Sequence, residues 1–486
     1  MNFETQLKLL LLSYNSLIYI VTEEEERLEY VIQNLSHEIF NSSICCWNFI
    51  DGYKNNPNYT QQGARNPLEA LEIIESSELK TTKIFLLKDF NNFINDLSII
   101  RKLKNISQIL KKTDKRIIIC ASEIEIPKLL KEYVTILDFP LPNEKEIQIE
   151  LRKLLKIIDI DESYVQELAL IYKGFTIERI RKSISRFLFI QENKSKILSS
   201  ILEEKKQLIQ QTDILEFCGT KNNLQDIGGL NNLKQWLKKR INGFSKTAQQ
   251  YGIPYPKGIL LIGIQGTGKS LSAKAISQEW KLPLLKLDIG KIFTGIVGQS
   301  EFRVRKMIRL SEQLAPCILW IDEIDKAFLK SNNYTDSGTS NRVLSSLLNW
   351  LSEKQKEVFV VATANNALQL PPELIRKGRF DEIFFIDLPN VHERKNIFQI
   401  HLKKIRPLSW QKYDTEYLSK ITDKFSGAEI EQVIIDSMFN AFHEKREFTT
   451  KDIEISIKGS TPLAYTNEID ICQIQDWAYS KGIQLA

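Results

Sequence analysis

The stretch Gly263-Ile264-Gln265-Gly266-Thr267-Gly268-Lys269-Ser270 decides the fold of the second half of the chain. An apolar run at 259–262 precedes it and predicts a buried strand, and the segment from Leu271 to Trp280 has helical spacing. A strand, a glycine-rich loop and a helix in this order are the context of a phosphate-binding loop. The glycines allow successive backbone N–H groups and the helix N-terminus to point at one anion. The pattern predicts a nucleoside triphosphate site, and a glycine turn without function is the less favoured alternative.

Two side chains of this loop have expected chemical roles. Lys269 reaches the β- and γ-phosphates, and the Ser270 hydroxyl ligates Mg²⁺. The residues expected to surround the nucleotide phosphates share this one segment. They are Gly263, Gln265, Gly266, Thr267, Gly268, Lys269, Ser270 and Leu271. We therefore expect ATP and Mg²⁺ as the cofactors.

A second apolar run, 318–321, ends in Asp322 and Glu323, which is a Walker B pattern. Asp322 can hold the Mg²⁺ that Ser270 also approaches, and Glu323 can polarise an attacking water. Such a strand end alone would indicate only solvated acids. About fifty residues after a phosphate loop, it favours catalysis. A third run, 358–362, precedes Asn365, whose amide could orient the same water or could cap a turn.

Arg376 and Arg379 lie three residues apart beside Gly378. A solvated basic turn is the plain interpretation of this pattern. The functional interpretation is a pair of arginines whose fixed charge stabilises a transferring phosphoryl group.

Composition excludes several classes of protein. The 486 residues carry 66 basic and 61 acidic side chains, a net charge of +5, so a mixed-charge surface is expected. No basic stripe with interleaved aromatic residues is present, which makes a nucleic-acid role unlikely. The six cysteines lack metal-ligand spacing. The apolar start at 9–21 is too short and too interrupted to span a membrane, and no targeting segment is visible.

The first half repeats the order of elements seen in the second. Apolar runs at 17–21, 84–87 and 116–120 predict buried strands, and Leu-Pro-Asn occurs at 141–143 and again at 388–390. An internal duplication explains this order, and chance similarity of two α/β modules is the alternative. Four acids, 23–26, stand where a phosphate loop would lie. They would repel a polyphosphate, so the first copy is expected to have lost nucleotide binding.

The order Asp226-Ile227-Gly228-Gly229-Leu230, Walker A, Walker B and Gly378-Arg379-Phe380-Asp381 resembles the AAA ATPase family. The resemblance covers residues 222–460 and implies a parallel-sheet P-loop domain, a helical lid, ring hexamers and Mg²⁺-ATP hydrolysis at subunit interfaces. It implies that Asn365 is a sensor and that Arg376 and Arg379 act on a neighbouring subunit. It further implies adenine or lid contacts for Ile227, Gly228, His401, Gly427 and Ala428.

The resemblance defines five expected regions. They are a degenerate AAA-like domain (1–192), a helical linker (193–221), the ATPase domain (222–392), a helical lid (393–460) and a C-terminal tail (461–486). The degenerate first half and the tail segment Gln475-Asp476-Trp477-Ala478 make the whole chain resemble AAA-type proteins of algal plastid genomes and cyanobacteria. This resemblance implies a location in the chloroplast stroma or in a cyanobacterial cytoplasm. Ile296-Val297-Gly298 stands where AAA rings that thread polypeptides usually have an aromatic residue followed by an aliphatic residue and glycine, so the resemblance does not by itself imply threading.

These patterns predict an ATPase that works as a ring and remodels an unidentified protein partner. An ATP-dependent binding module with slow turnover is the alternative. Intact Asp322, Glu323 and the two arginines favour turnover, whereas Ile296 and the acidic loop at 23–26 favour an adaptor.

Overall fold

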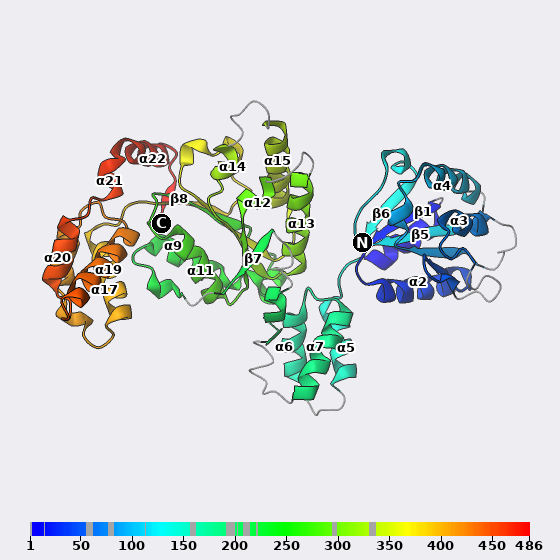
Figure 1. The fold of residues 1–486 in the computed structure, drawn as a ribbon, viewed down its shortest axis with the longest axis horizontal. Helices are drawn as coiled ribbons and strands as arrows, with labels where there is room; N and C mark the ends of the chain where they lie inside the picture. Colours follow the sequence, from blue (N-terminus) through cyan, green and yellow to red (C-terminus); the bar gives the residue numbers. More distant parts are fainter. Residues whose placement is uncertain are drawn as a thin grey trace. The chain divides into compact units, whose positions relative to one another are not determined.

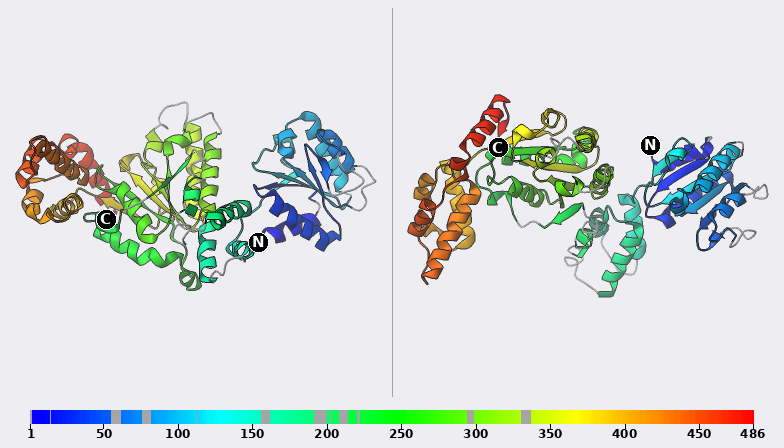
Figure 2. Two further views of the ribbon diagram at one scale, coloured as in Figure 1. Left: turned by 60° about the horizontal axis from the view of Figure 1, so that its bottom comes forward. Right: turned by 45° about the horizontal axis from the view of Figure 1, so that its top comes forward.

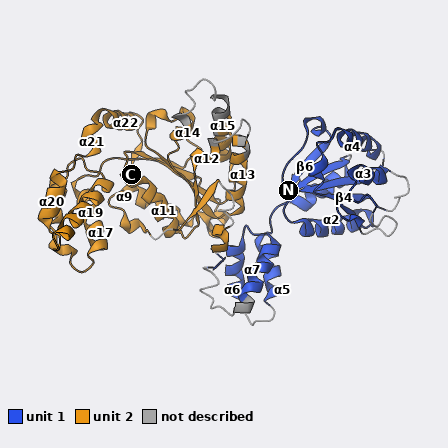
Figure 3. Cartoon of the chain, in the orientation of Figure 1, with its two compact units in different colours: residues 1–201 blue, residues 202–486 orange. Residues whose placement is uncertain are grey.

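The computed structural model describes residues 2–13, 15–54, 62–75, 82–111, 113–155, 162–190, 200–201, 203–207, 214–219, 222–293, 299–329 and 337–486. The chain divides into two compact units, residues 1–201 and residues 202–486, shown in blue and orange in Figure 3. Each unit has its own sheet and its own hydrophobic cores.

The first unit contains a six-stranded sheet in the order β3-β2-β4-β5-β1-β6. Its strands are β1 (Leu17–Val21), β2 (Cys45–Asn48), β3 (Gly52–Lys54), β4 (Ile84–Lys88), β5 (Arg116–Ala121) and β6 (Val134–Asp138). All neighbours pair in parallel except β2 and β3. The strands predicted at 17–21, 84–87 and 116–120 are confirmed, because apolar runs of this length are buried on both faces of a parallel sheet.

Helices cover both faces of this sheet (Figure 1). They are α1 (Phe3–Leu12), α2 (Glu25–Phe40), α3 (Pro67–Glu75) and α4 (Leu97–Leu110). Leu17 and Tyr19 pack with α3 and α4, whereas Ile18 and Ile20 pack with α1 and α2, as the alternation of side chains along a strand requires. Three further helices follow the sheet: α5 (Glu144–Leu154), α6 (Glu162–Tyr172) and α7 (Ile177–Ile190).

The second unit contains a seven-stranded sheet in the order β13-β12-β8-β11-β10-β9-β7. Its strands are β7 (Leu215–Cys218), β8 (Gly258–Gly263), β9 (Leu284–Leu287), β10 (Cys317–Ile321), β11 (Val358–Ala364), β12 (Glu382–Ile386) and β13 (Gln484–Leu485). Only β7 pairs antiparallel, on the outer side of β9. The series β9-β10-β11-β8-β12 follows the same path through the chain as β2-β4-β5-β1-β6. This shared topology supports the internal duplication, and the predicted AAA-type α/β fold is confirmed.

Two layers of helices cover the second sheet. Ile259 and Leu261 face α9 (Asn231–Arg240) and α11 (Lys269–Trp280), whereas Leu260 and Ile262 face α12 (Ile289–Phe293), α13 (Gln299–Gln313) and α15 (Ser337–Glu353). The shorter helices are α10 (Lys246–Gln250), α14 (Lys326–Leu329) and α16 (Pro372–Ile375). The predicted helix at 271–280 is confirmed and begins two residues earlier, at Lys269.

A helical lid follows β12. Its helices are α17 (Val391–Ile405), α18 (Thr415–Ile421), α19 (Gly427–His443) and α20 (Thr450–Lys458), and they gather into one cluster in Figures 1 and 2. Asn390 caps α17 and Ser426 caps α19, each through a capping box. Asn143 caps α5 in the same way, so both Leu-Pro-Asn sequences start a helix.

The connection between the units differs from the expected helical linker, and the C-terminal tail adds a strand to the second sheet. The segment 193–221 is not helical throughout, because β7 lies within it. Leu215 is buried and Phe217 is partly buried, and both pack against the core on one side of the strand, as the alternation of side chains in a strand allows. After the lid, α21 (Leu463–Thr466) and α22 (Glu468–Ser480) lead to β13, which extends the sheet beside β12. No helix in the described ranges has the length and apolar character needed to cross a membrane.

Candidate functional site

The candidate site lies at the carboxyl ends of three adjacent strands, β8, β11 and β10. The phosphate loop follows β8, Asp322 follows β10, and Asn365 follows β11. Because parallel strands end at the same edge of a sheet, segments about fifty residues apart in sequence meet there.

The phosphate loop turns sharply into α11. Gly266 and Gly268 have φ angles of 79° and 96°, in the left-handed region that favours glycine. Gly263 ends β8, Gln265 is exposed, and the Thr267 hydroxyl donates to the Ile264 carbonyl at 2.7 Å. The loop thus directs the N-terminus of a twelve-residue helix toward the strand ends, which is the arrangement that binds phosphate.

Lys269 is a buried cation in this loop, with 6% of its surface exposed. Its Nζ donates to the carbonyls of Gly263 and Ile264, at 2.7 and 2.6 Å. Burial lowers the pKa of Lys269 to about 8, and nearby Asp325, Asp322 and Glu323 oppose this shift. An anionic phosphate beside the ammonium would favour its charged form and replace the solvation lost on burial.

Ser270 and Asp322 are brought together as predicted. The Ser270 hydroxyl donates to Asp322 Oδ1 at 3.3 Å. Thr363, which is on β11, also donates to Asp322 Oδ1, at 2.7 Å. Hydroxyl and carboxylate oxygens are the ligands that Mg²⁺ prefers. Leu271, the next residue, is half-buried and packs against the α9–α11 core.

Glu323 and Asn365 are in direct contact. Asn365 Nδ2 donates to Glu323 Oε1 at 3.0 Å, and Lys326 Nζ lies 2.5 Å from Glu323 Oε2. Glu323 has a φ of 50°, an unusual backbone for a residue with a side chain, and its N–H donates to Thr363 Oγ1 at 3.0 Å. Backbone strain of this kind is concentrated at functional sites.

Thr363 and Asp325 are site residues that the sequence analysis missed. Thr363 joins Asp322 to the backbone of Glu323. Asp325 Oδ2 accepts from the N–H groups of Asn365 and Asn366, at 3.2 and 3.0 Å, while its buried Oδ1 has no hydrogen-bond partner among the described residues. The signals were an acid three residues after Asp322, and a hydroxyl residue two before Asn365.

The lid contacts the phosphate loop. The Ala428 N–H donates to the Gly266 carbonyl at 3.1 Å, and Gly427 starts α19 beside it. On α17, Ile397 packs against Gly228 so closely that a Cβ there would lie 2.3 Å from the isoleucine side chain. Ile227 is buried and its carbonyl accepts from Lys234 Nζ at 2.6 Å. The phosphate loop and the segment of Ile227 and Gly228, which is expected to contact adenine, therefore both contact the lid.

His401 lies one helical turn after Ile397 on α17. Its Nδ1 is 3.5 Å from Glu431 Oε1 on α19. Burial lowers the pKa of His401, and the Glu431 carboxylate opposes this shift.

The two arginines are not part of this cluster. Arg376 is exposed after α16, and Arg379 donates to the Glu373 carbonyl of the same turn. Within the described residues of the chain, no hydrogen bond or ion pair joins either arginine to the phosphate loop. The predicted pore residues 296–298 lie outside the described ranges.

The residues present fit Mg²⁺-ATP. A buried ammonium, a glycine loop at a helix N-terminus and the paired oxygens of Ser270 and Asp322 provide phosphate and metal ligands. Glu323 and Asp325 add negative charge to the site, and this charge repels a polyphosphate. A cation bound with the polyphosphate would offset this repulsion.

The corresponding place in the first unit is filled by the chain itself. Glu24 is buried, and its Oε1 accepts from the N–H of Ile177, at the start of α7, at 2.7 Å. Its Oε2 lies 3.1 Å from Arg27 Nε, and burial raises the pKa of Glu24. In the second unit the matching helix, α19, starts beside the phosphate loop. In the first unit a carboxylate takes that position, which agrees with the expected loss of nucleotide binding.

Two family models match the chain. Residues 3–139 match the SpoVK-like AAA ATPase, N-terminal domain, and residues 259–388 match the ATPase family associated with various cellular activities (AAA). The chain is 59% identical to the AAA domain-containing protein ycf46 of Gracilaria tenuistipitata var. liui, with all of both chains covered. It is 52% identical to that of Guillardia theta, covering all of this chain and 97% of the relative.

A more distant relative is the Cell division cycle protein 48 homolog of Archaeoglobus fulgidus. It is 36% identical over 225 residues, 45% of this chain and 30% of the relative. The full-length matches, the two family models and the strand order agree, and the chain belongs to the AAA ATPase family.

Proposed function

We propose that the second unit binds ATP with Mg²⁺ and hydrolyses it to ADP and phosphate. The observation that carries this proposal is the cluster of Lys269, Ser270, Asp322, Glu323 and Asn365 at one sheet edge. Lys269 and the loop N–H groups hold the phosphates, and Ser270 and Asp322 hold the metal. Mg²⁺, when bound, neutralises charge on the β- and γ-phosphates.

Glu323 is the residue placed to take a proton from the attacking water. Asn365, 3.0 Å away, orients the glutamate or the water.

We further propose that the chain forms a ring of identical subunits, a hexamer in the family's usual form, in which Arg376 and Arg379 reach the neighbour's nucleotide. Arg376 is exposed and Arg379 is partly exposed, and in the described part of the chain neither is bonded to its own phosphate loop, which supports this arrangement. The ring would remodel a protein partner, and the names of the full-length relatives support a location in plastids.

A slowly hydrolysing, ATP-dependent binding module is the second candidate. It is favoured by the contacts of Glu323, because both of its carboxylate oxygens already have partners, Asn365 and Lys326. Water would have to displace one of them before attack.

A steady-state ATPase assay with the Glu323→Gln variant as control tests the proposal. Hydrolysis by the wild type that is lost in Glu323→Gln, while ATP still binds, supports an ATPase. Binding without multiple turnovers in the wild type supports the binding module. Equal turnover in both proteins would remove Glu323 from the proposed role.

A further inference from the structure

Lys286 is the one charged residue of β9, whose sequence is otherwise leucine. In the sheet it lies opposite Trp320 of β10. Its Nζ is 4.6 Å from the centre of the indole ring and 3.5 Å from Asp322 Oδ2. Because Asp322 lies two residues after Trp320, the lysine extends along the indole toward the proposed magnesium ligand.

The two oxygens of Asp322 have different partners. Oδ1 accepts from Thr363 and Ser270, whereas Oδ2 faces Lys286. The side chains of Lys286 and Asp322 are only 33% and 22% exposed, and Trp320 beneath them is buried. Water therefore screens this charge pair less than it would screen a surface pair.

This inference rests on the ATP site proposed above. We propose that Lys286 is a positioning residue of that site, a fixed cation that neutralises Asp322 and partly replaces the charge of Mg²⁺ when the metal is absent. Without metal, ATP brings its negative charge close to Asp322, Glu323 and Asp325, and the lysine reduces the repulsion. With metal bound, the ion supplies this charge, so the contribution of Lys286 becomes small.

With Lys286 in place, removing Mg²⁺ should therefore lower ATP affinity less than it would in a site without this lysine. If Lys286 were only a structural contact of Trp320, its loss would lower stability and would change ATP affinity equally with and without metal. If it acts as the proposed cation, its loss weakens metal-free binding selectively. The ratio of the two affinities separates the two roles.

Calorimetry on the full chain in a Glu323→Gln background measures ATP affinity in excess EDTA and in saturating Mg²⁺. Lys286→Met keeps the aliphatic contact with Trp320 and removes the charge. We expect it to weaken binding in EDTA about tenfold, given the strength of a partly buried charge pair. Binding in Mg²⁺ changes much less, so the Mg²⁺/EDTA affinity ratio rises about tenfold.

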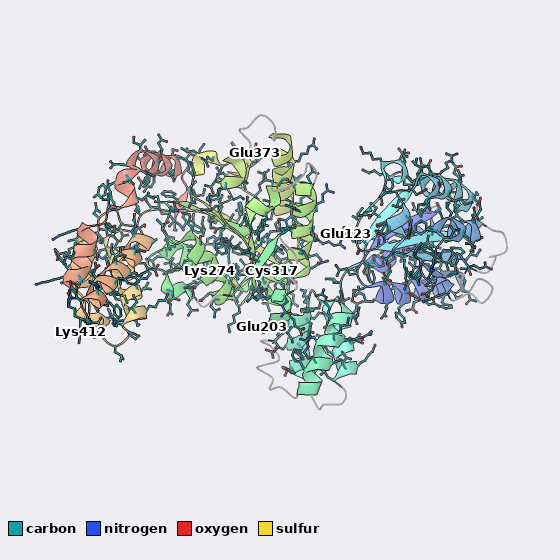
Figure 4. The ribbon with its side chains drawn as sticks, viewed as in Figure 1. Glu123, Glu203, Lys274, Cys317, Glu373 and Lys412 are labelled. Carbon is teal, nitrogen blue, oxygen red and sulfur yellow. The ribbon has the colours of Figure 1, made fainter. Side chains whose placement is uncertain are left out.

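Two further variants serve as controls. Lys286→Arg keeps the charge and should keep the wild-type ratio. Lys274→Met is matched, because Lys274, labelled in Figure 4, lies on α11 with its Nζ 5.9 Å from the centre of the same indole ring. No ion pair joins it to Asp322 in the described part of the chain, so its ratio should also stay unchanged.

An unchanged ratio in Lys286→Met, with or without a lower melting temperature, would overturn the inference while leaving the ATP site intact. A parallel rise of the ratio in Lys274→Met would also overturn it, since the effect would then be general electrostatics. If the parent Glu323→Gln protein binds no ATP in EDTA and none in Mg²⁺, the proposed ATP site itself is refuted.

Discussion

Replacing Thr363 by valine removes one hydroxyl from the centre of the site with little change in volume. That hydroxyl donates to Asp322 Oδ1 at 2.7 Å and accepts from the N–H of Glu323 at 3.0 Å. Thr363 is 1% exposed, so water cannot easily replace either bond. The variant therefore releases the proposed metal ligand and the proposed base together.

The expected loss follows from these two bonds. A hydrogen bond to a charged group contributes about 1.5–3 kcal/mol, and each 1.4 kcal/mol is about tenfold in rate. If the bond to Asp322 is needed in the transition state, kcat/KM should fall about ten- to a hundredfold in Thr363→Val. The partly buried N–H of Glu323, left without this acceptor, adds a loss of stability of up to about 1–3 kcal/mol.

Steady-state ATPase kinetics and thermal melting of the full chain measure the two effects. Thr363→Ser keeps the hydroxyl and should retain most of the activity, with a small loss of stability from the missing methyl group. A Thr363→Val protein with wild-type kcat/KM would refute the assigned role of this hydroxyl. Equal losses in the serine and valine variants would show that packing, and not hydrogen bonding, is responsible.

The other predictions concern the subunit contact and the lid. Arg376→Ala and Lys269→Ala subunits should each be nearly inactive alone, and mixing them should restore ATPase activity. In a mixed ring, Lys269→Ala subunits supply the intact arginines to the intact nucleotide sites of Arg376→Ala subunits. Such an arginine contributes a factor of roughly 10³–10⁵ to the rate. A co-assembled mixture without activity would contradict shared sites. In the lid, the Arg446 guanidinium and the Thr449 hydroxyl, both donating to Asp452, hold the pKa of this carboxyl well below its usual range. The ionised carboxylate therefore stabilises the fold above about pH 4, and this stabilisation is lost as the pH falls further. Asp452→Asn should lower the melting temperature at pH 7 and much less at about pH 2, where this carboxyl is protonated in the unfolded chain. An equal effect at both pH values would show that its charge is not what stabilises the lid.

Sequence alone predicted the elements that unbroken apolar runs define. The runs that became β1, β8, β10 and β11 are buried on both faces of parallel sheets, and this leaves a clear pattern. The short edge strands leave no such pattern. β7 has four residues and β13 two, and each depends on pairing with a distant partner strand that no local pattern reveals.

The candidate site shows the same division. Lys269 and Ser270 were predictable because the phosphate loop has a fixed spacing and a chemical reason for each residue. Asp322 was predictable because it ends an apolar strand about fifty residues after that loop. The bridging role of Thr363 and the buried Asp325 were not, since they depend on β11 and β10 being neighbours. The buried ion pair of Glu24 and Arg27 was equally hidden, although the acidic run itself predicted the loss of phosphate binding.

Calorimetric titration of the full-length Glu323→Gln chain with ATP in the presence of Mg²⁺ is the decisive test of the proposed site, because this variant should bind the nucleotide without consuming it. We expect one ATP bound per chain, since Glu24 fills the matching place in the first unit, and no measurable binding once Lys269→Ala is added, because it removes the buried ammonium. Two sites per chain, or undiminished affinity in Lys269→Ala, would contradict it.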